Sequence, residues 1–331
     1  MTRGGRRPRR ARRSLPLFAL GLTLLAGCEI ASTPTSGSPV VTDRSSGADT
    51  RPAVAPAAGP RQLVRSPGPS SFSFAPSGAL AGQRVTVYVQ APEDCANATI
   101  LVVMPGQNRN AQDYRADWQP MVAGRNVLVL VPEFAETDFP GPDEYNLGNV
   151  LRSDGKANPS DSWTYRIVEQ LFDAVVADVG GHQAGYRIFG HSAGAQFVHR
   201  LLMLIPENRV TTAVVANAGW YTMPDDNVDF PYGLRGVPTD ERDLRTTFAK
   251  DMVVLLGAED TDPDSSSMRQ DEPALAQGPY RLARGLTFYR SAADAAVQHG
   301  FQLRWRLVTV PGVAHDHTEM GRAAAAYLIG P

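Results

Sequence analysis

The sequence contains little cysteine: only Cys28 and Cys95 in 331 residues. Exported proteins with small cores usually depend on several disulfides, and two cysteines cannot supply such a framework. Hydrophobic residues make up 43% of the chain and charged residues 20%, which is typical of a globular protein. We therefore expect the fold to depend on a sizeable hydrophobic core, in one large domain or two ordinary ones.

Positive charge is scarce outside the N-terminus. The chain has 32 basic and 34 acidic residues, but seven of the arginines lie within the first 13 residues. No acidic residue precedes Glu29, so removal of residues 1–27 leaves 25 basic and 34 acidic residues and a net charge of −9. A surface with this charge disfavours phosphate backbones, and we expect no nucleic-acid partner.

The chain also lacks an apolar run as long as a membrane-spanning helix needs. The stretch LPLFALGLTLLAG (15–27) has the length of a signal-peptide core. It ends in LAGC, which resembles the bacterial lipobox, where the chain is cut before a cysteine that is then lipidated. We predict a signal peptide over residues 1–27 and a lipid anchor on Cys28, with an ordinary cleavable signal as the alternative. Export by the Sec or the twin-arginine route stays open, because ARRSLPL has paired arginines.

Residues 28–71 are rich in Ser, Thr, Pro, Ala and Gly and show no apolar period. A segment of this composition buries too little surface to offset its ordering entropy. We predict that residues 28–71 carry the lipidated Cys28 and a disordered tether, and that residues 72–331 form the folded domain. If Cys28 is lipidated, Cys95 is the only thiol left and no intramolecular disulfide can form.

Strand-like and helix-like segments alternate from about residue 72. Several strand-like segments are continuous apolar runs, as in a parallel sheet covered on both faces, whereas the first alternates and is expected at an edge. The pattern predicts an α/β fold with a mostly parallel, doubly wound sheet and helices on both faces. The predicted strands are 84–90, 98–104, 126–131, 186–190, 211–218, 251–257 and 303–310, and the predicted helices are about 111–122, 162–179, 193–205, 280–299 and 316–329.

A serine lies between two glycines where a predicted strand meets a predicted helix. The stretch RIFGHSAGAQ (187–196) contains Gly190, Ser192 and Gly194. In a chain with 30 glycines, the pattern GHSAG (190–194) could be an ordinary turn of small residues. A nucleophile elbow, however, requires a strand before the serine and a helix after it, and both are predicted here. The glycines permit close backbone approach, and the helix N-terminus directs free N–H groups at developing negative charge. We predict that Ser192 is a nucleophile.

A serine nucleophile needs a base and an acid that orients the base. Acidic residues follow the predicted strand 251–257 in AEDTDPD, and histidines follow the strand 303–310 in PGVAHDH. Because parallel strands end at the same edge of a sheet, both loops would lie at the same edge as Ser192. The sequence therefore predicts a serine, an acid and a histidine at one sheet edge.

From about residue 84 to its end the chain resembles the α/β-hydrolase superfamily. Within it, the arrangement is similar to secreted serine esterases that include feruloyl esterases and polyhydroxybutyrate-depolymerase-like enzymes. The resemblance rests on LVVMPGQNRNAQDY (101–114), GHSAG, LLGAEDTD and VPGVAHDH. It implies a triad of Ser192, Asp260 and His315.

The resemblance also implies an oxyanion hole made by the backbone N–H groups of Gln107 and Ala193. The family usually has a histidine before Gly106, but this chain has Pro105. The side chain that would brace the loop in the family is therefore missing here, while the N–H of Gln107 can still serve.

The acid has alternatives. Asp260 stands three residues after Gly257, the spacing that the resemblance favours, and Asp262 and Glu259 are the rivals. The run DTDPDSSS also suggests a calcium loop, with four aspartates at suitable offsets, but it has a serine where the loop needs glycine. Those aspartates are Asp260, Asp262, Asp264 and Asp271.

Four histidines lie near the predicted site. His317 is the alternative to His315 as the base. The HDH sequence lacks a third metal ligand, so we expect no metal. We interpret His191 as a residue that shapes the turn and His199 as a packing residue.

Aromatic residues follow two predicted strands at the same edge. We predict that Trp220 and Tyr221 in NAGWYTMP line the substrate pocket. The long segment 132–149 would form a lid or binding loop, although its aromatic residues could equally be ordinary packing: Phe134, Phe139 and Tyr145. An aromatic-lined site would suit an aryl ester or a polyester segment.

These patterns favour a serine esterase that forms an acyl-enzyme and needs no cofactor. A serine peptidase or amidase of the same fold, and a catalytically inactive binding lipoprotein, are the alternatives. We expect a small-molecule or polymeric ester as substrate and a monomeric enzyme. The lipid anchor would hold it to a membrane of the bacterial cell envelope, on the periplasmic or extracellular face.

Overall fold

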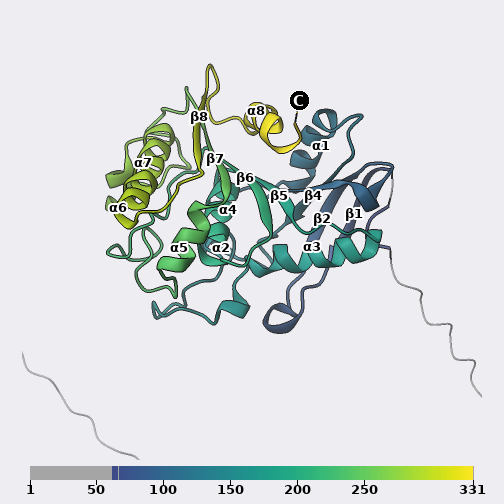
Figure 1. Ribbon diagram of the computed structural model, residues 1–331, viewed down its shortest axis with the longest axis horizontal. Helices are drawn as coiled ribbons and strands as arrows, with labels where there is room; N and C mark the ends of the chain where they lie inside the picture. The colour runs from purple at the N-terminus through teal and green to yellow at the C-terminus, as the bar shows by residue number, and fades with distance from the viewer. Residues whose placement is uncertain (1–61, 66, 331) are drawn as a thin grey trace, which may run out of the picture. The chain divides into compact units, whose positions relative to one another are not determined.

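A computed structural model describes residues 62–65 and 67–330. The predicted signal peptide, Cys28 and the predicted tether as far as residue 61 lie outside the described residues. The described part is built on an eight-stranded sheet in the order β1-β2-β4-β3-β5-β6-β7-β8 (Figure 1). The strands are β1 (Gly68–Phe74), β2 (Val85–Ala91), β3 (Thr99–Met104), β4 (Val127–Glu133), β5 (Tyr186–His191), β6 (Val210–Ala216), β7 (Asp251–Gly257) and β8 (Arg306–Val310).

The sheet is mostly parallel. β2 runs antiparallel to both of its neighbours, and every other neighbouring pair is parallel. The register aligns Val102, Ile188, Ala213 and Met252 in one row across four strands, and all four are fully buried. Such rows explain the continuous apolar runs in the sequence, because both faces of the sheet are covered.

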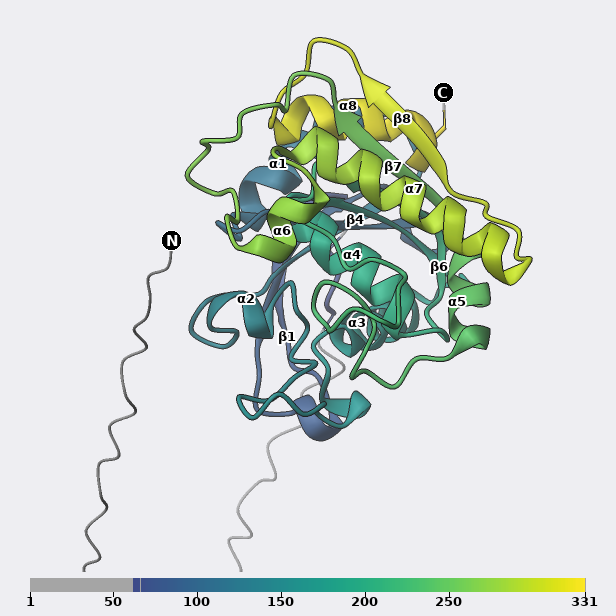
Figure 2. The same cartoon turned by 90° about the vertical axis from the view of Figure 1, so that its left-hand side faces the viewer.

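Helices cover both faces of the sheet. α1 and α8 pack on one face with Leu101 and Val103 of β3, and α3, α4 and α7 pack on the other with Val102 and Met104. Figure 1 shows α1 and α8 on the opposite side of the sheet from α3, and Figure 2 shows α7 running along β7. The predicted fold class is confirmed. The helices are α1 (Ala111–Met121), α2 (Gly141–Glu144), α3 (Arg166–Val179), α4 (Ala193–Leu204), α5 (Glu241–Phe248), α6 (Glu272–Gln277), α7 (Arg281–His299) and α8 (His317–Leu328).

Local signals in the sequence set several helix ends. α3 ends at Gly180 and α7 at Gly300, each with a positive φ (65° and 68°) that favours glycine after a helix. α8 begins after Asp316, whose side chain accepts a hydrogen bond from the N–H of Glu319. This cap fixes the start of α8 next to His315.

Two expectations about the N-terminal edge need correction. The predicted domain boundary at residue 72 falls inside β1, and the N–H groups of Leu63 and Val64 already bond the Asp178 carboxylate at 2.9 Å each. β1 is an edge strand with one buried residue, so it needs few apolar side chains. Its sequence GPSSFSF is therefore similar in composition to the segment before it, and the two were not told apart. The strand expected at the edge is β2, which lies between β1 and β4.

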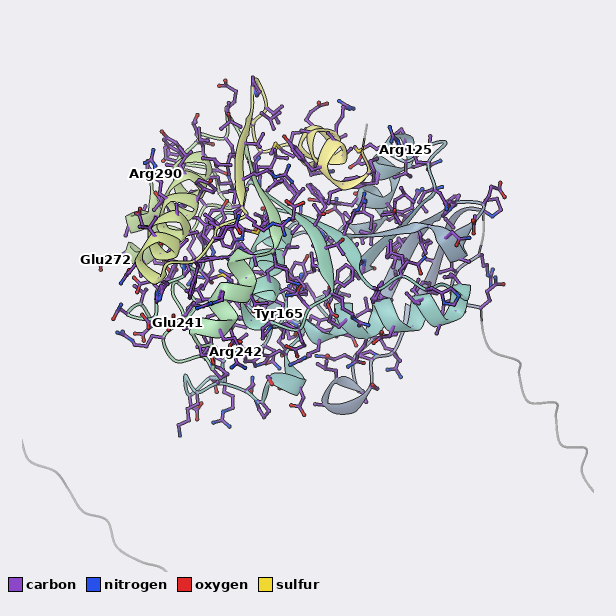
Figure 3. The ribbon with its side chains drawn as sticks, viewed as in Figure 1. Arg125, Tyr165, Glu241, Arg242, Glu272 and Arg290 are labelled. Atoms are coloured by element: carbon purple, nitrogen blue, oxygen red, sulfur yellow. The ribbon has the colours of Figure 1, made fainter. Side chains whose placement is uncertain are left out.

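Charged side chains gather at the surface of the described domain. Glu241, Arg242, Glu272 and Arg290 are exposed and lie at its rim in Figure 3, whereas Tyr165 is fully buried. Within residues 62–65 and 67–330, no helix combines the length and the apolar character that crossing a membrane requires.

Candidate active site

Ser192 occupies a tight turn between β5 and α4. Its φ is +57°, a left-handed value that is costly for a residue with a Cβ. Its N–H donates to the carbonyl of Ala216 at 2.9 Å, which ties the turn to the end of β6. The strand, the strained serine and the helix have the geometry of a nucleophile elbow.

The two glycines of the elbow are required by space. A Cβ on Gly190 would lie 2.3 Å from the carbonyl oxygen of Gly194, and a Cβ on Gly194 would lie 2.0 Å from the carbonyl oxygen of Met104. Both distances are far below van der Waals contact with backbone atoms. Glycine at these positions lets α4 start directly against the ends of β5 and β3.

The structure brings Ser192, His315 and Asp260 together. His315 Nε2 lies 3.1 Å from Ser192 Oγ, and His315 Nδ1 lies 2.7 Å from Asp260 Oδ2. Asp260 is 3% exposed, and the His315 side chain is 28% exposed. Both distances are within hydrogen-bond range. The first would permit proton transfer from the Ser192 hydroxyl to His315, and the second would orient the His315 ring.

The three residues meet because of the sheet topology. Ser192 follows β5, Asp260 stands three residues after β7, and His315 stands five residues after β8. All three strands are parallel, so they end at the same edge.

The rival residues lie elsewhere. Asp262 and Glu259 are exposed on the loop after β7. His317 stacks on Tyr114 with ring centroids 4.4 Å apart, and its Nδ1 is 2.9 Å from Asp117 Oδ2. The structure therefore pairs neither the alternative acids nor the alternative base with Ser192.

Two of the four aspartates of the calcium hypothesis have other partners. Asp260 binds His315, and Asp271 caps α6 by accepting from the N–H of Ala274. Across the described part of the chain, no group of three or more His, Cys, Asp or Glu side chains is arranged to hold a metal ion.

Asn217, directly after β6, joins the loops that carry the acid and the histidine. Its Oδ1 accepts from the N–H of Gly257 at 2.8 Å, and its Nδ2 donates to the carbonyl of Ala314 at 3.0 Å. Asn217 is 1% exposed and has a φ of +50°. The sequence analysis missed this residue, although an asparagine at the end of a predicted strand at the active edge was a signal for it.

The two residues of the predicted oxyanion hole lie at the same cavity. Ala193 is the first residue of α4, and the first N–H groups of a helix have no acceptor inside the helix. Gln107 is on the loop after β3, where a Cβ on the preceding Gly106 would lie 3.6 Å from the Cβ of Ser192. Both residues line a cavity of about 490 Å³ beside the serine.

Two tyrosine hydroxyls hold the loop that carries Gln107. Tyr114 accepts a hydrogen bond from the N–H of Gly106 at 3.1 Å, and Tyr145 donates to the carbonyl of Pro105 at 2.6 Å. The family's histidine is absent at Pro105, and these hydroxyls brace the loop from α1 and from the segment after α2. Sequence analysis did not single out Tyr114, and it considered Tyr145 as a lid or packing residue.

His191 is a neutral, buried residue behind the elbow. Its Nδ1 lies 3.2 Å from the Tyr114 hydroxyl, whose oxygen already accepts from Gly106, so the hydroxyl proton points to Nδ1. Burial lowers the pKa of His191 well below its ordinary value, and the nearby charges of His315, His317 and Arg281 lower that pKa further. His191 shapes the site without carrying charge.

The cavity beside Ser192 is lined mainly by polar side chains. The lining includes Trp220, whose ring centroid lies 4.3 Å from the Arg200 guanidinium and 4.9 Å from the Arg269 guanidinium. Burial lowers the pKa of Arg200 to about 10. The remaining lining residues include Asn108, Arg109, Asn146, Gln196 and Met268.

Most aromatic residues predicted near the cavity belong to the core. Tyr221 is fully buried, stacks on Phe288 at 4.5 Å and does not line the cavity. Phe134 and Phe139 are at most 1% exposed and pack on each other, so the packing interpretation holds for them. Trp220, by contrast, lines the cavity.

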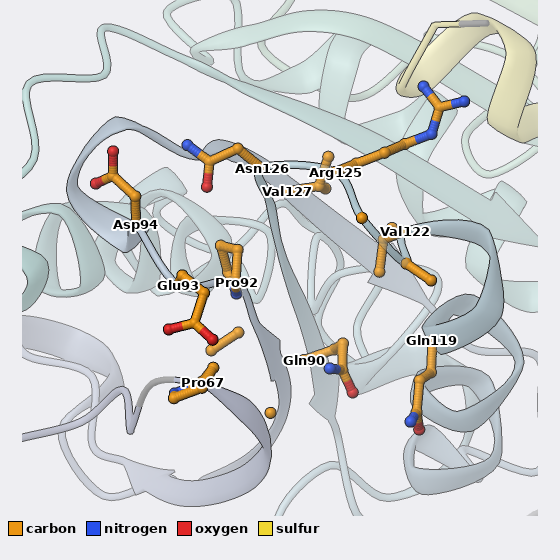
Figure 4. A pocket seen from close by; sticks show the side chains of 14 residues that line it. Pro67, Gln90, Pro92, Glu93, Asp94, Gln119, Val122, Arg125, Asn126 and Val127 are labelled. Carbon is orange, nitrogen blue, oxygen red and sulfur yellow. The ribbon is translucent and has the colours of Figure 1, made fainter.

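Another cavity, of about 590 Å³, lies at the opposite edge of the sheet (Figure 4). It is lined by Ala91 at the end of β2 and by Asn126 and Val127 at the start of β4. Parallel strands begin at this edge, whereas Ser192, Asp260 and His315 lie where they end. We place no chemistry in this cavity.

Comparison with solved structures finds many similar proteins, and two of them each cover 79% of this chain. Poly(aspartic acid) hydrolase-1 from Sphingomonas sp. KT-1 matches with a TM-score of 0.75 and 38% identity, over 79% of this chain and 98% of that chain. LpqC, a poly(3-hydroxybutyrate) depolymerase from Bordetella parapertussis, matches with a TM-score of 0.75 and 32% identity, over 79% of this chain and 89% of that chain.

A more distant structure shares the fold alone. Siderophore hydrolase EstB from Aspergillus nidulans has a TM-score of 0.51 and 14% identity, over 81% of this chain and 97% of that chain. Comparisons with protein-family models and with curated proteins find no match.

Proposed function

The chain belongs to the α/β-hydrolase superfamily, and from that premise we propose that this hydrolase is a serine esterase that uses Ser192, His315 and Asp260. The observation that carries the proposal is the chain of contacts from Ser192 Oγ through the two nitrogens of His315 to Asp260, at 3.1 and 2.7 Å. The resemblance in sequence and the similar solved structures support the same chemistry.

In the proposed reaction, His315 Nε2 takes the proton of Ser192 as Oγ attacks the ester carbonyl carbon. Asp260 accepts the Nδ1–H hydrogen bond, which keeps the ring in the required tautomer and stabilises the imidazolium. His315 then gives the proton to the departing alcohol. Water, deprotonated by His315, then attacks the acyl carbon; the bond to Ser192 Oγ breaks, the proton returns to Oγ and the acid is released.

The backbone N–H groups of Gln107 and Ala193 would stabilise the oxyanion that forms in each half of the reaction. Loss of one such donor costs on the order of 3 kcal/mol in comparable sites. The tyrosine bonds to Pro105 and Gly106 support this role, because they hold the loop before the reaction begins and little reorganisation is needed.

The cavity supports a polar substrate segment rather than the aryl ester that, like a polyester segment, an aromatic-lined site would suit. Its lining contains amide and guanidinium groups. Of the five aromatic residues that the sequence suggested near it, Trp220 and Tyr145 line it and the other three do not. The two closely similar solved proteins are named for polymers, poly(aspartic acid) and poly(3-hydroxybutyrate). We propose a polymeric or oligomeric substrate whose repeating unit carries hydrogen-bonding groups.

Amide hydrolysis is the second candidate. It is favoured by the 38% identity to a poly(aspartic acid) hydrolase, because poly(aspartic acid) is joined by amide bonds. The same triad can perform either reaction, so substrate tests must include both linkages.

We also propose that the protein is a bacterial lipoprotein anchored through Cys28 and that it acts as a monomer. The support is LAGC after an apolar stretch, followed by a segment rich in Ser, Pro and Ala. Cys28→Ser would then block lipid labelling of the full chain in cells and move the protein from the membrane fraction to the soluble fraction.

The function is tested with a fluorophosphonate probe and two substrate panels, p-nitrophenyl esters and aminoacyl anilides. The parent protein is expected to be labelled and to hydrolyse the esters, and Ser192→Ala should lose both properties. His315→Ala should cost a factor similar to that of Ser192→Ala, because triad members act as a unit, whereas the matched variant His317→Ala should cost less than about tenfold. Full labelling of Ser192→Ala would exclude the proposed nucleophile, and faster turnover of anilides would favour the amidase.

A further inference from the structure

Two buried arginines occupy the first turn of α7. Arg281 is 2% exposed and Arg284 is fully buried, and no acidic residue lies in this turn. The N-terminal end of a helix carries a positive partial charge that disfavours cations, and a buried charge is costly unless it is paired. The partners of these arginines must offset both costs.

Arg284 holds main-chain carbonyls. Its guanidinium donates to the carbonyl oxygens of Gly219 at 2.7 Å, Arg269 at 2.8 Å and Gly278 at 2.9 Å. These bonds fix the loops on which Trp220 and Arg269 are presented to the cavity. These three bonds explain why Arg284 is buried: it holds the loops together.

Arg281 instead reaches the carboxylate of the proposed triad. Its Nη1 lies 3.3 Å from Asp260 Oδ1, while Asp260 Oδ2 bonds His315. The N–H of Leu282 also donates to the Asp260 carbonyl at 3.1 Å. The start of α7 therefore fixes both the backbone and the side chain of Asp260.

The same guanidinium reaches the wall of the cavity. Arg281 Nη2 donates to Ser267 Oγ at 2.6 Å, and Ser267 lines the cavity beside Ser192 together with Met268 and Arg269. One side chain thus connects the acid at the back of the site with the wall that faces substrate.

We propose that Arg281 is a positioning residue that holds Asp260 in the orientation that directs His315 and couples it to the cavity wall through Ser267. The inference rests on the proposed function of Ser192, Asp260 and His315. Without the guanidinium, Asp260 Oδ1 would be a buried oxygen without this partner, and the orientation of the carboxylate toward His315 would no longer be fixed from the start of α7.

The charge of Arg281 also acts on the imidazolium that forms during the reaction. The groups around His315 are Asp260 at 2.7 Å, the neutral ring of His191 at a centroid distance of 4.6 Å, and, behind Asp260, Arg281. His317 lies beyond His191, at 6.1 Å between ring centroids. Removal of the Arg281 charge leaves the Asp260 charge unopposed, which favours protonation of His315.

The test compares Arg281→Met, Arg281→Lys and Arg290→Met in the full chain. Arg290 is on the same helix and exposed at the surface (Figure 3), so it controls for loss of an arginine from α7. For Arg281→Met we expect kcat to fall about 10²-fold and the acidic limb of the pH–rate profile to move about one unit to higher pH. Arg281→Lys should return the limb to the parent position, and Arg290→Met should match the parent in both readouts.

A double-mutant cycle with Asp260→Asn keeps the test decisive if Arg281→Met folds poorly. The double variant removes both members of the buried ion pair, so it leaves no unpaired charge. If Arg281 acts through Asp260, adding Arg281→Met to Asp260→Asn should lower kcat by less than about threefold. The proposal would be overturned if the fold-losses in kcat of the two single variants multiplied in the double variant. An unchanged acidic limb of the pH–rate profile in Arg281→Met would also overturn it.

Fluorophosphonate labelling distinguishes a failure of this inference from a failure of the proposed function on which it rests. A parent protein that is not labelled at Ser192 would overturn the proposed function and the role of Arg281 together. A labelled parent with an unchanged pH limb in Arg281→Met would overturn only the role of Arg281.

Discussion

Tyr114→Phe should slow catalysis while leaving the fold in place. The substitution removes one oxygen, which accepts from the buried N–H of Gly106 at 3.1 Å and contacts His191 Nδ1 at 3.2 Å. The phenyl ring keeps its place against His317 and in the core beneath α1. The perturbation is therefore confined to the brace on the loop that carries Gln107 and to the hydrogen bond of His191 Nδ1.

The magnitude follows from the hydrogen bond that is lost. A buried N–H without an acceptor costs about 1–3 kcal/mol. In a domain of this size each kcal/mol lowers the melting temperature by about 2–4 °C. If the loop relaxes so that the N–H of Gln107 no longer reaches the oxyanion, kcat falls by up to about 10²-fold. We expect a loss between about 10- and 10²-fold, with KM changed by less than about threefold because the ground state uses the oxyanion hole weakly.

The assay measures kcat and KM on a p-nitrophenyl ester together with affinity for a boronic acid, which forms a tetrahedral anion on the serine. Boronate affinity should fall in parallel with kcat/KM. Tyr186→Phe is the matched control, because Tyr186 is equally buried but its hydroxyl donates to Glu169 at the far end of β5. A Tyr114→Phe enzyme with parental kcat and a lowered melting temperature, like Tyr186→Phe, would refute the role of the brace.

Two further outcomes follow from the elbow and its helix. Gly194→Ala should abolish activity, because its Cβ would lie 2.0 Å from the Met104 carbonyl oxygen, whereas Gly82→Ala, with open space around it, should be fully active; an active Gly194→Ala enzyme would contradict the packing. Burial lowers the pKa of His191 and of His199 well below the ordinary value, and His199 is held neutral by donating to Ala195 and accepting from Thr222. Below the unfolded pKa of about 6.5, the unfolded chain binds protons that the folded chain does not. The free energy of unfolding, measured with urea, should therefore fall by about 1.4 kcal/mol per pH unit for each histidine as the pH drops. His199→Gln should halve that slope, and an equal slope in parent and variant would contradict the assignment.

The fold and the grouping of Ser192, Asp260 and His315 could be predicted because their signals are local in the sequence. The apolar runs predicted the sheet, and the position of Ser192 between a strand and a helix predicted the elbow. Asp260 and His315 each follow a predicted strand, and the parallel sheet then places them together. Such reasoning needs only the order of elements and the direction of the strands.

The residues that support the site could not be found in this way. Arg281 and Tyr114 lie on helices, where an arginine or a tyrosine is usually a surface or packing residue. Their roles depend on which loop a helix end touches, and a helical period carries no such information. Tyr221 shows the reverse case, since its neighbour Trp220 lines the cavity while its own ring turns into the core. β1 was missed because an edge strand needs few apolar residues.

The position of β8 has a consequence for how the protein would lose activity. β8 is the last strand of the sheet, pairs with β7 alone and has no buried residue, and His315 follows it. Ser192 instead follows β5, in the middle of the sheet. Stability is not uniform within a fold, and a poorly buried edge opens at lower free energy than the centre. Partial opening at β8 would carry away the proposed base while β3, β5 and β6 stay paired, so activity should vanish at urea concentrations that leave the far-UV ellipticity almost unchanged.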